Sequence, residues 1–364
     1  MTLFDILGYK SFRMINYPRK NPLSLTLAIT SKCNSRCRTC YIWKKNENGY
    51  ELNIDEYGKI FQSFKKPIYE LILTGGEPFL RDDIVEICRT ANVYLKPKVI
   101  IIPTNGILTE KIAKDIDAIL ATSYKTKIII NISLDGIRQD NDEIRGLEGS
   151  FDKAIKTYLV LKEIRNVFLD LKVHTVISSY NVDKISKIYK YIKEVLKTNL
   201  FIIEVAQERA ELNNQGRGKE VVPPLQKYLE AINLLSDRLE KEKFTGLSKM
   251  IQSFRLEYYQ LTKHILEKKR QIIPCYAGFA SAQIAPNGEV WFCPTKAKPV
   301  GNLRKSNYKF EKIWFSEKAD ELRRENNKGN CYCCLANIAY INMLYHFNSL
   351  LKVFIRFIKY NFKS

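Results

Sequence analysis

The sequence predicts an α/β fold: a partial (β/α)6 TIM-like barrel, followed by a small cysteine-rich domain and a helical tail. Short β-rich runs alternate with helical patterns between residues 25 and 206, which is typical of a parallel sheet with helices on its outside. Eight of the nine cysteines fall in two groups, one early and one late in the chain. Polar motifs follow four successive predicted strands, where barrels of this kind carry their chemistry.

Six strands and five connecting helices make up the predicted barrel. Each strand is a β-rich run of strand length, and six strand–helix units make an incomplete barrel. The predicted strands are Leu25–Thr30, Glu70–Thr74, Lys98–Pro103, Ile128–Leu134, Leu171–Ile177 and Leu200–Ala206. The predicted helices are Ile54–Phe64, Asp82–Val93, Thr109–Leu120, Phe151–Asn166 and Val182–Leu196.

The pattern changes after Gly216 and Gly218. Two long charged helices are expected at Pro223–Lys243 and Leu247–Arg270, and a strand-like stretch with a turn at Pro286-Asn287-Gly288 follows. The predicted divisions are a barrel over residues 22–215, a helical linker over 216–271, a cysteine-rich domain over 272–335 and a basic amphipathic helix over 336–364.

Composition favours a folded, cytosolic protein that binds metal. Of the 364 residues, 45% are apolar, enough for a large core, and the N-terminus lacks the long apolar region of a signal peptide. An odd number of cysteines without an export signal argues against a disulfide framework. The formal charge of +20 favours nucleic acid, an anionic membrane or a polyphosphate as a partner, or else it reflects a lysine-rich proteome.

The first cysteine group is Cys33, Cys37 and Cys40, spaced Cys-x3-Cys-x2-Cys directly after the first predicted strand. Three thiolates on one tight loop can hold three irons of a cubane cluster. The fourth iron is then left without a protein ligand, and an open metal position is where catalysis can occur. Structural zinc is the alternative, but zinc needs a fourth ligand and no histidine lies nearby in the sequence.

Polar motifs also follow the next three predicted strands. Gly75–Pro78 follows the second strand, Thr104–Gly106 the third and Ser133–Gly136 the fourth, with Arg145 just beyond. The glycines allow the backbone to approach a ligand closely, and Glu77 can accept an ammonium group. Each motif alone is an ordinary turn, but together they place polar groups at the mouth of the barrel.

These motifs, together with Ile144–Phe151, resemble those of the radical S-adenosylmethionine (SAM) superfamily over residues 22–206. The resemblance implies a catalytic [4Fe–4S] cluster whose open iron is chelated by the amino and carboxylate groups of SAM. It also implies reductive cleavage of SAM to a 5′-deoxyadenosyl radical, which removes a hydrogen atom from an unactivated C–H bond. The electron would come from a reducing donor such as a flavodoxin or ferredoxin.

The resemblance assigns contacts to SAM as well. Gly76 and Glu77 would contact its amino group, while Arg145 would contact the carboxylate and Ser133 the ribose. Many members have an aromatic residue before the third cysteine, where this chain has a threonine, so Tyr41 would cover the adenine instead. The predicted SAM-binding residues are Tyr41, Gly76, Glu77, Thr104, Ser133 and Arg145.

The second group lies in the last third of the chain and comprises Cys275, Cys293, Cys331, Cys333 and Cys334. A hairpin turn would bring the first two together, and four thiolates suit an Fe–S cluster or structural zinc. The region is similar to the SPASM/twitch domains of radical SAM enzymes, which implies an auxiliary [4Fe–4S] cluster. Because a full SPASM pattern needs further cysteines, the shorter twitch form fits better. The x2 spacing favours Cys334 beside Cys275, Cys293 and Cys331, with Cys333 as a spare or exchangeable ligand.

Other polar residues receive weaker assignments. Cys88 lies on an apolar helical face and is expected to be a buried small hydrophobe. His174, on the fifth strand, is expected to pack rather than bind. The residues that close the sixth strand are either substrate contacts or a solvated loop: Glu204, Gln207, Glu208 and Arg209.

The end of the chain predicts a basic amphipathic helix. Residues 326–364 contain no Asp or Glu, and basic residues recur there every three or four positions, which places them on one helical face. These residues are Lys352, Arg356, Lys359 and Lys363. One hypothesis is that the helix lies peripherally on the anionic inner face of a membrane. The alternative is that it packs on the barrel with its lysines in solvent.

Four classes of function follow from these features. The leading hypothesis is a cytoplasmic radical SAM oxidoreductase or bond-forming enzyme acting on a small, sugar-type or lipid-linked substrate. In it, the auxiliary cluster accepts an electron or anchors the substrate. Ribosomal-peptide modification, by epimerisation or crosslinking, is the alternative, since only 32 residues precede Cys33, too few for a leader-peptide recognition domain. RNA modification ranks lower because no RNA-binding module is recognisable, and a metal-bound scaffold or electron carrier is the non-enzymatic class.

Overall fold

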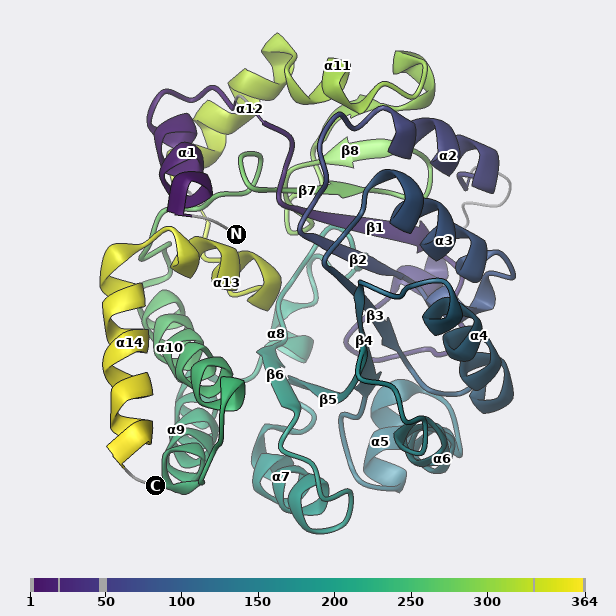
Figure 1. Ribbon diagram of the computed structural model, residues 1–364. Coiled ribbons are helices and arrows are strands. Elements are labelled where there is room, and N and C mark those ends of the chain that lie inside the picture. Colours follow the sequence, from purple (N-terminus) through teal and green to yellow (C-terminus); the bar gives the residue numbers. More distant parts are fainter. Residues whose placement is uncertain (1–2, 19, 46–50, 330, 363–364) are drawn as a thin grey trace.

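One sheet of nine strands runs through the described residues, which are 3–18, 20–45, 51–329 and 331–362 of the computed structural model. The strand order is β6-β5-β4-β3-β2-β1-β7-β8-β9 (Figure 1). The first six strands pair in parallel with their neighbours in chain order. The sheet does not close into a ring, because β6 and β9 form its two edges. The predicted α/β class with six parallel strands is confirmed.

The six parallel strands lie within two residues of their predicted bounds. β1 is buried along its whole length, because it is paired on both sides, whereas β3 and β4 alternate between buried and half-buried residues. That alternation reflects the two faces of each strand. The bounds are β1 Ser24–Thr30, β2 Glu70–Gly75, β3 Val99–Thr104, β4 Lys127–Ser133, β5 Leu169–Ile177 and β6 Phe201–Val205.

Helices between these strands cover the outer face of the sheet (Figure 1). The predicted helix Val182–Leu196 is divided into the 3-10 turn η3 Val182–Lys184 and α7 Ile185–Glu194. The short helix α5 Gln139–Arg145 was not predicted, since seven residues carry too little periodicity to show a face. The others are α2 Ile54–Gln62, α3 Ile84–Tyr94, α4 Thr109–Ala121 and α6 Ser150–Lys162. Cys88 is fully buried in α3, as expected.

The C-terminal third extends the same sheet. β7 Ser281–Ile284 pairs in parallel with β1, and β8 Glu289–Trp291 returns antiparallel to β7. The turn between them uses Gly288 at φ +82°, a conformation that suits glycine, so the predicted hairpin is confirmed. β9 Pro299–Asn302 completes the sheet, and α11 Phe310–Trp314 and α12 Glu317–Asn327 follow it. The predicted domain boundaries stay a prediction.

The remaining helices pack on the side of the sheet away from α2, α3 and α4 (Figure 1). Both predicted charged helices are present, and α10 packs against α9, α13 and α14. In the described part of the chain, no helix combines the length and apolar character needed to cross a membrane. The bounds are α1 Leu3–Met14, α8 Gly218–Val221, α9 Leu225–Lys241, α10 Leu247–Lys268, α13 Ala336–Leu344 and α14 Phe347–Phe362. Lys363 lies outside the described residues.

Candidate active site

The first cysteine loop follows β1 and gathers three thiols. Burial, with a smaller contribution from the neighbouring Cys37, raises the pKa of Cys33 to about 11, although a hydrogen bond from the Ser35 N–H opposes the shift. Burial likewise raises the pKa of Cys40 to about 12, with added repulsion from both other thiolates. Thiols that influence one another in this way lie close together, so the structure brings the predicted trio to one place.

Two other loops fix this cysteine loop through the backbone. The Arg36 and Arg38 N–H groups donate to the carbonyls of Arg145 and Ile144, at 3.0 and 2.8 Å. From the β2 side, the Gly76 N–H donates to Thr30 O at 2.8 Å. The loops that carry the predicted SAM contacts are therefore bonded directly to the loop that carries the cysteines.

Gly76 owes its identity to this close approach. A Cβ atom there would lie 2.0 Å from the carbonyl oxygen of Lys32, far inside contact distance. Gly75 has φ +132°, and a Cβ on it would lie 2.1 Å from Thr30 O. The sequence predicts glycines for close approach to a ligand, whereas the structure shows that both are required for approach to the cysteine loop.

Glu77 is a buried acceptor that links two predicted contacts. Its carboxylate accepts hydrogen bonds from Thr104 Oγ1 and the Asn105 N–H, both at 2.8 Å, and from the Phe79 N–H at 3.2 Å. Burial raises its pKa to about 7, although these hydrogen bonds oppose the shift. Glu77 and Thr104, selected separately from the sequence, therefore form one hydrogen-bonded unit after β2 and β3.

Arg145 stands beside the thiols. Its Nη2 lies 2.9 Å from Asp135 Oδ2 and its Nη1 3.8 Å from Cys37 Sγ. Burial lowers the pKa of Arg145, but Asp135 and Cys37 outweigh that effect and hold the pKa above its usual range. Its Nε is buried without a hydrogen-bond partner among the described residues. A fixed cation with one free donor suits an anionic ligand group.

Tyr41 directly follows Cys40, and Ser133 is the last residue of β4. The Tyr41 ring stacks on Trp43, with centroids 6.2 Å apart, and the Arg217 guanidinium lies 4.2 Å from its centroid. Ser133 ends β4 and is paired in register with His174 on β5. Tyr41 is thus already engaged by a cation, and Ser133 sits at the mouth of the sheet as predicted.

The second cysteine group assembles from three segments. Burial raises the pKa of Cys275 to about 12, with further repulsion from Cys293 and Cys331. Burial also raises the pKa of Cys333 to about 12, with repulsion from Cys293 next and a smaller contribution from Cys275. Cys333 packs in a small cluster with Leu335, Ile338 and Cys275. The thiols of Cys275, Cys293, Cys331 and Cys333 are therefore coupled electrostatically, and Cys334 is coupled to Cys331 and Cys333.

Cys334 belongs to a different apolar cluster from Cys333. It packs in the main hydrophobic core, and burial, then Cys333 and Cys331, raise its pKa. Its N–H donates to Gln207 Oε1 at 2.7 Å, and its carbonyl accepts from the Tyr258 hydroxyl at 2.9 Å. The choice of Cys334 from the x2 spacing stays a prediction, and the packing of Cys333 beside Cys275 offers the alternative.

The donor sets suit clusters rather than single ions. Within the described residues, no three His, Cys, Asp or Glu side chains surround a single metal-ion position. Zinc requires four ligands around one atom, whereas the thiolates of a cubane each bind a different iron. Both groups consist of thiols alone, and thiolates are the ligands of [4Fe–4S] clusters.

A cavity of about 470 Å³ is lined by residues of the six parallel strands, of β7 and of α13. Its wall includes Pro294, next to Cys293, and Leu335, next to Cys334. Glu204 and Arg209 line it, and so does His174, whose Nε2 lies 3.7 Å from Glu204 Oε2. His174 therefore faces the cavity, where the sequence favoured packing.

The other two residues of the sixth-strand loop serve the structure. Gln207 bonds the segment of the second cysteine group, and Glu208 accepts a hydrogen bond from the Gly218 N–H at 2.6 Å. Sequence reasoning missed further polar residues of the cavity wall, of which Asn131 gave a signal as an amide within an apolar strand. The missed wall residues are Asn131, Glu211, Gln283 and Tyr340.

Comparison with known families decides the identity of the fold. The family model described as the radical SAM superfamily matches residues 27–192, and the SPASM model, described as an iron–sulfur cluster-binding domain, matches residues 275–335. The chain belongs to the radical SAM superfamily. It is an enzyme that uses SAM and a [4Fe–4S] cluster, and its C-terminal SPASM domain carries an auxiliary cluster.

Three similar proteins place this radical SAM enzyme among its relatives. The antilisterial bacteriocin subtilosin biosynthesis protein AlbA of Bacillus subtilis is 27% identical over 79% of this chain, but the match spans only 58% of AlbA. An AdoMet-dependent heme synthase of Methanosarcina barkeri is also 27% identical, over 88% of this chain and 89% of the relative. The structure of Streptococcus suis SuiB bound to its precursor peptide SuiA has a TM-score of 0.61 and 16% identity, over 88% and 71%. That structure shows a shared fold.

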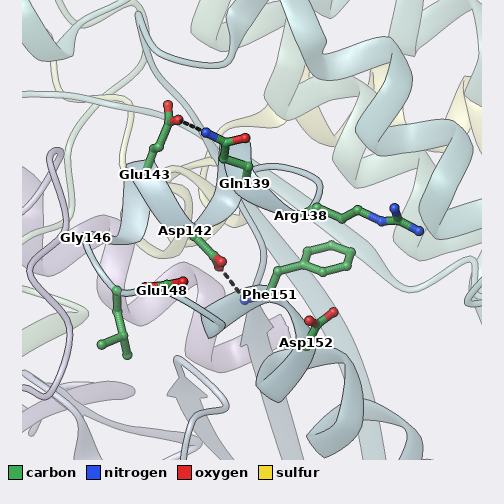
Figure 2. A pocket seen from close by; sticks show the side chains of 9 residues that line it. Arg138, Gln139, Asp142, Glu143, Gly146, Glu148, Phe151 and Asp152 are labelled. Carbon is green, nitrogen blue, oxygen red and sulfur yellow. Dashed lines mark hydrogen bonds between the residues drawn. The ribbon is translucent and has the colours of Figure 1, made fainter.

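A second hollow of the radical SAM domain lies away from the thiols. It has a volume of about 870 Å³ and is lined by α5 and the start of α6 (Figure 2). Its carboxylate Asp142 accepts hydrogen bonds from the N–H groups of Gly149 and Phe151, both at 2.8 Å. Burial opposes them, but these bonds hold the pKa of Asp142 below its usual range. These hydrogen bonds belong to the start of α6, and the wall of the hollow contains none of the cysteines.

Proposed function

We propose that this radical SAM enzyme modifies a peptide, by oxidation, crosslinking or epimerisation of a residue held inside the barrel. The cavity lined by residues of β1 to β6 carries the proposal. Its volume of about 470 Å³ falls in the range of ligand pockets and suits one side chain and its neighbours from a longer chain. Its wall includes Thr74 and Pro103, which directly precede the motifs after β2 and β3, and Pro294, next to Cys293.

The relatives support a peptide over the small, sugar-type or lipid-linked substrate. AlbA takes part in the biosynthesis of a bacteriocin, and the SuiB structure contains a precursor peptide. The heme synthase favours a small molecule as the second candidate, since its match covers most of both chains. The mainly apolar wall of the cavity is compatible with either substrate class.

The proposed ligands of the catalytic cluster are Cys33, Cys37 and Cys40. When bound, the cluster and SAM supply a 5′-deoxyadenosyl radical. Arg145, held by Asp135 at 2.9 Å, offsets the charge of the thiolates and offers its free Nε to the SAM carboxylate. Glu77 and Thr104 hold the backbone that receives the amino group. Tyr41, Gly76 and Ser133 complete the proposed contacts with SAM.

For the auxiliary cluster we propose Cys275, Cys293, Cys331 and Cys333. Cys333 packs in one small apolar cluster with Cys275, whereas Cys334 packs in the main core. A substrate that loses a hydrogen atom and is then oxidised releases one proton and one electron. Glu204 and His174, 3.7 Å apart on the cavity wall, are placed to accept the proton.

The test is anaerobic reconstitution with dithionite and SAM, with and without the peptide encoded by a short reading frame beside the gene. We expect the peptide to stimulate release of 5′-deoxyadenosine. Its mass should fall by two hydrogens, or gain deuterium from heavy water if it is epimerised. The control is the chain with Cys33, Cys37 and Cys40 all replaced by alanine, which should release no 5′-deoxyadenosine. If the peptide stayed unchanged while a small molecule offered in its place were altered, the second candidate would be established.

A further inference from the structure

Helix α14 has two apolar faces, and only one of them is covered. Ser349, Val353 and Tyr360 are buried, where α14 packs against α10. On the opposite face, six large apolar side chains are spaced so that they form one stripe along the helix. Their exposed fractions are Phe347 70%, Leu351 46%, Phe354 54%, Ile355 45%, Ile358 36% and Phe362 86%.

This exposed stripe, Phe347 to Phe362, differs from isolated apolar residues at a surface. Single exposed apolar residues are normal, but a contiguous apolar patch marks an interaction surface. The stripe runs along the outer edge of the molecule, where α14 lies (Figure 1). Its helix is held from behind, because Arg356 is paired with Glu257 of α10. The stripe is therefore presented on a fixed helix rather than on a loose tail.

Positive charge accompanies the stripe. Lys352 and Lys359 are exposed on α14, and residues 326–364 contain no Asp or Glu. At the near end of the stripe, Lys10 and Met14 of α1 line a hollow of about 210 Å³ together with Phe347. Met14 is 76% exposed. The apolar surface with its basic border thus continues from α14 onto the end of α1.

We propose that the stripe docks this enzyme on an anionic lipid surface, with α14 lying in the plane of the membrane interface. Large apolar side chains with lysines beside them are the pattern by which a helix enters the headgroup region without spanning it. Anionic lipids also complement a chain with a formal charge of +20. A second copy of the chain is a poor occupant, because two strongly cationic surfaces would meet.

Co-sedimentation of the full-length reconstituted enzyme with lipid vesicles tests this inference. The vesicles are phosphatidylcholine alone, or phosphatidylcholine mixed with phosphatidylglycerol. We expect binding to the mixed vesicles only, weakened by salt. The double variant Phe354→Ser/Ile358→Ser should bind about tenfold more weakly, since two apolar side chains that would enter the membrane interface are lost. The matched control is Leu159→Ser/Val160→Ser, which removes two exposed apolar residues of α6 and should bind as the unmodified chain does.

Three results would overturn the inference. Equal binding to both kinds of vesicle would remove the role of charge, and equal binding of both double variants would remove the role of the stripe. If sedimentation velocity showed a dimer that Phe354→Ser/Ile358→Ser dissociates, the stripe would be an interface between copies. Iron content is measured for every variant, so a folding defect is recognised separately. The inference does not depend on the proposed peptide substrate.

Discussion

The two cysteine groups differ in how the chain brings their thiols together. The first holds three cysteines within eight residues, and neighbouring loops fix it through backbone hydrogen bonds. The second draws its thiols from three distant segments, which side chains join. Gln207 bonds the backbone on both sides of Cys333, and the Gln271 amide donates to the Cys333 carbonyl at 2.9 Å.

This difference indicates which parts of a metal site can be predicted from a short motif. Backbone hydrogen bonds depend little on side-chain identity, so a short motif is enough to define the first loop. In the second group, the direction of each thiol depends on packing with residues far away in the sequence. Adjacent cysteines can therefore pack in different clusters, as Cys333 and Cys334 do.

The largest expected effect separates those two cysteines. Cys333→Ala should reduce the iron content of the reconstituted chain from about eight atoms to about four, because one cubane loses a ligand. Cys334→Ala should keep about eight irons and lower the free energy of unfolding by about 1 kcal/mol, as expected for truncation in a packed core. Iron and sulfide counting, with chemical denaturation, measures both. Loss of iron in Cys334→Ala alone would restore the assignment based on spacing.

The next effect tests the backbone contacts of the first loop. Gly76→Ala would place a methyl group 2.0 Å from Lys32 O, so the two loops must separate. We expect a loss of about 3 kcal/mol in the free energy of unfolding, at the upper end for overpacking, together with poor assembly of the catalytic cluster.

The matched control is Gly58→Ala in α2, where an added Cβ meets no atom within 4 Å. Because alanine is more favourable than glycine in a helix interior, the free energy of unfolding of this variant should rise by about 1 kcal/mol. Thermal unfolding and the cluster absorbance of both variants are the measurements. If Gly76→Ala assembled its cluster as Gly58→Ala does, the contact with Lys32 would not fix the loop.

The sequence predicted the strands and helices better than the contacts between them. The six parallel strands matched within two residues, because continuous apolar runs mark buried strands. The hydrogen bond between Glu77 and Thr104 joins the ends of two strands 27 residues apart, and no local pattern reports it. The sequence indicates that glycine is needed at positions 75 and 76, but it does not show that Thr30 and Lys32 approach them.

The smallest expected effect concerns the contact between α2 and the segment that follows β9. Arg304, after β9, donates to both carboxylate oxygens of Glu56 in α2, at 2.6 and 3.0 Å. The Tyr308 hydroxyl donates to the same carboxylate at 3.0 Å. The bonds from Arg304 lower the pKa of Glu56 to about 2, although partial burial opposes them.

A carboxyl group whose folded pKa lies below its unfolded value stabilises the fold above the unfolded pKa, about 4.3 for glutamate. That contribution is lost as the pH falls from about 4 to about 2. Screening by solvent reduces it to about 1 kcal/mol, so Glu56→Gln should be less stable by that amount at pH 7 and equal to the unmodified chain near pH 2. Urea unfolding across this range measures it. The control is Glu86→Gln, whose partner Arg89 lies three residues away on the exposed face of α3. Since that pair joins nothing beyond its own helix, an equal loss in both variants would mean that the Glu56–Arg304 contact does not hold α2 to the segment that follows β9.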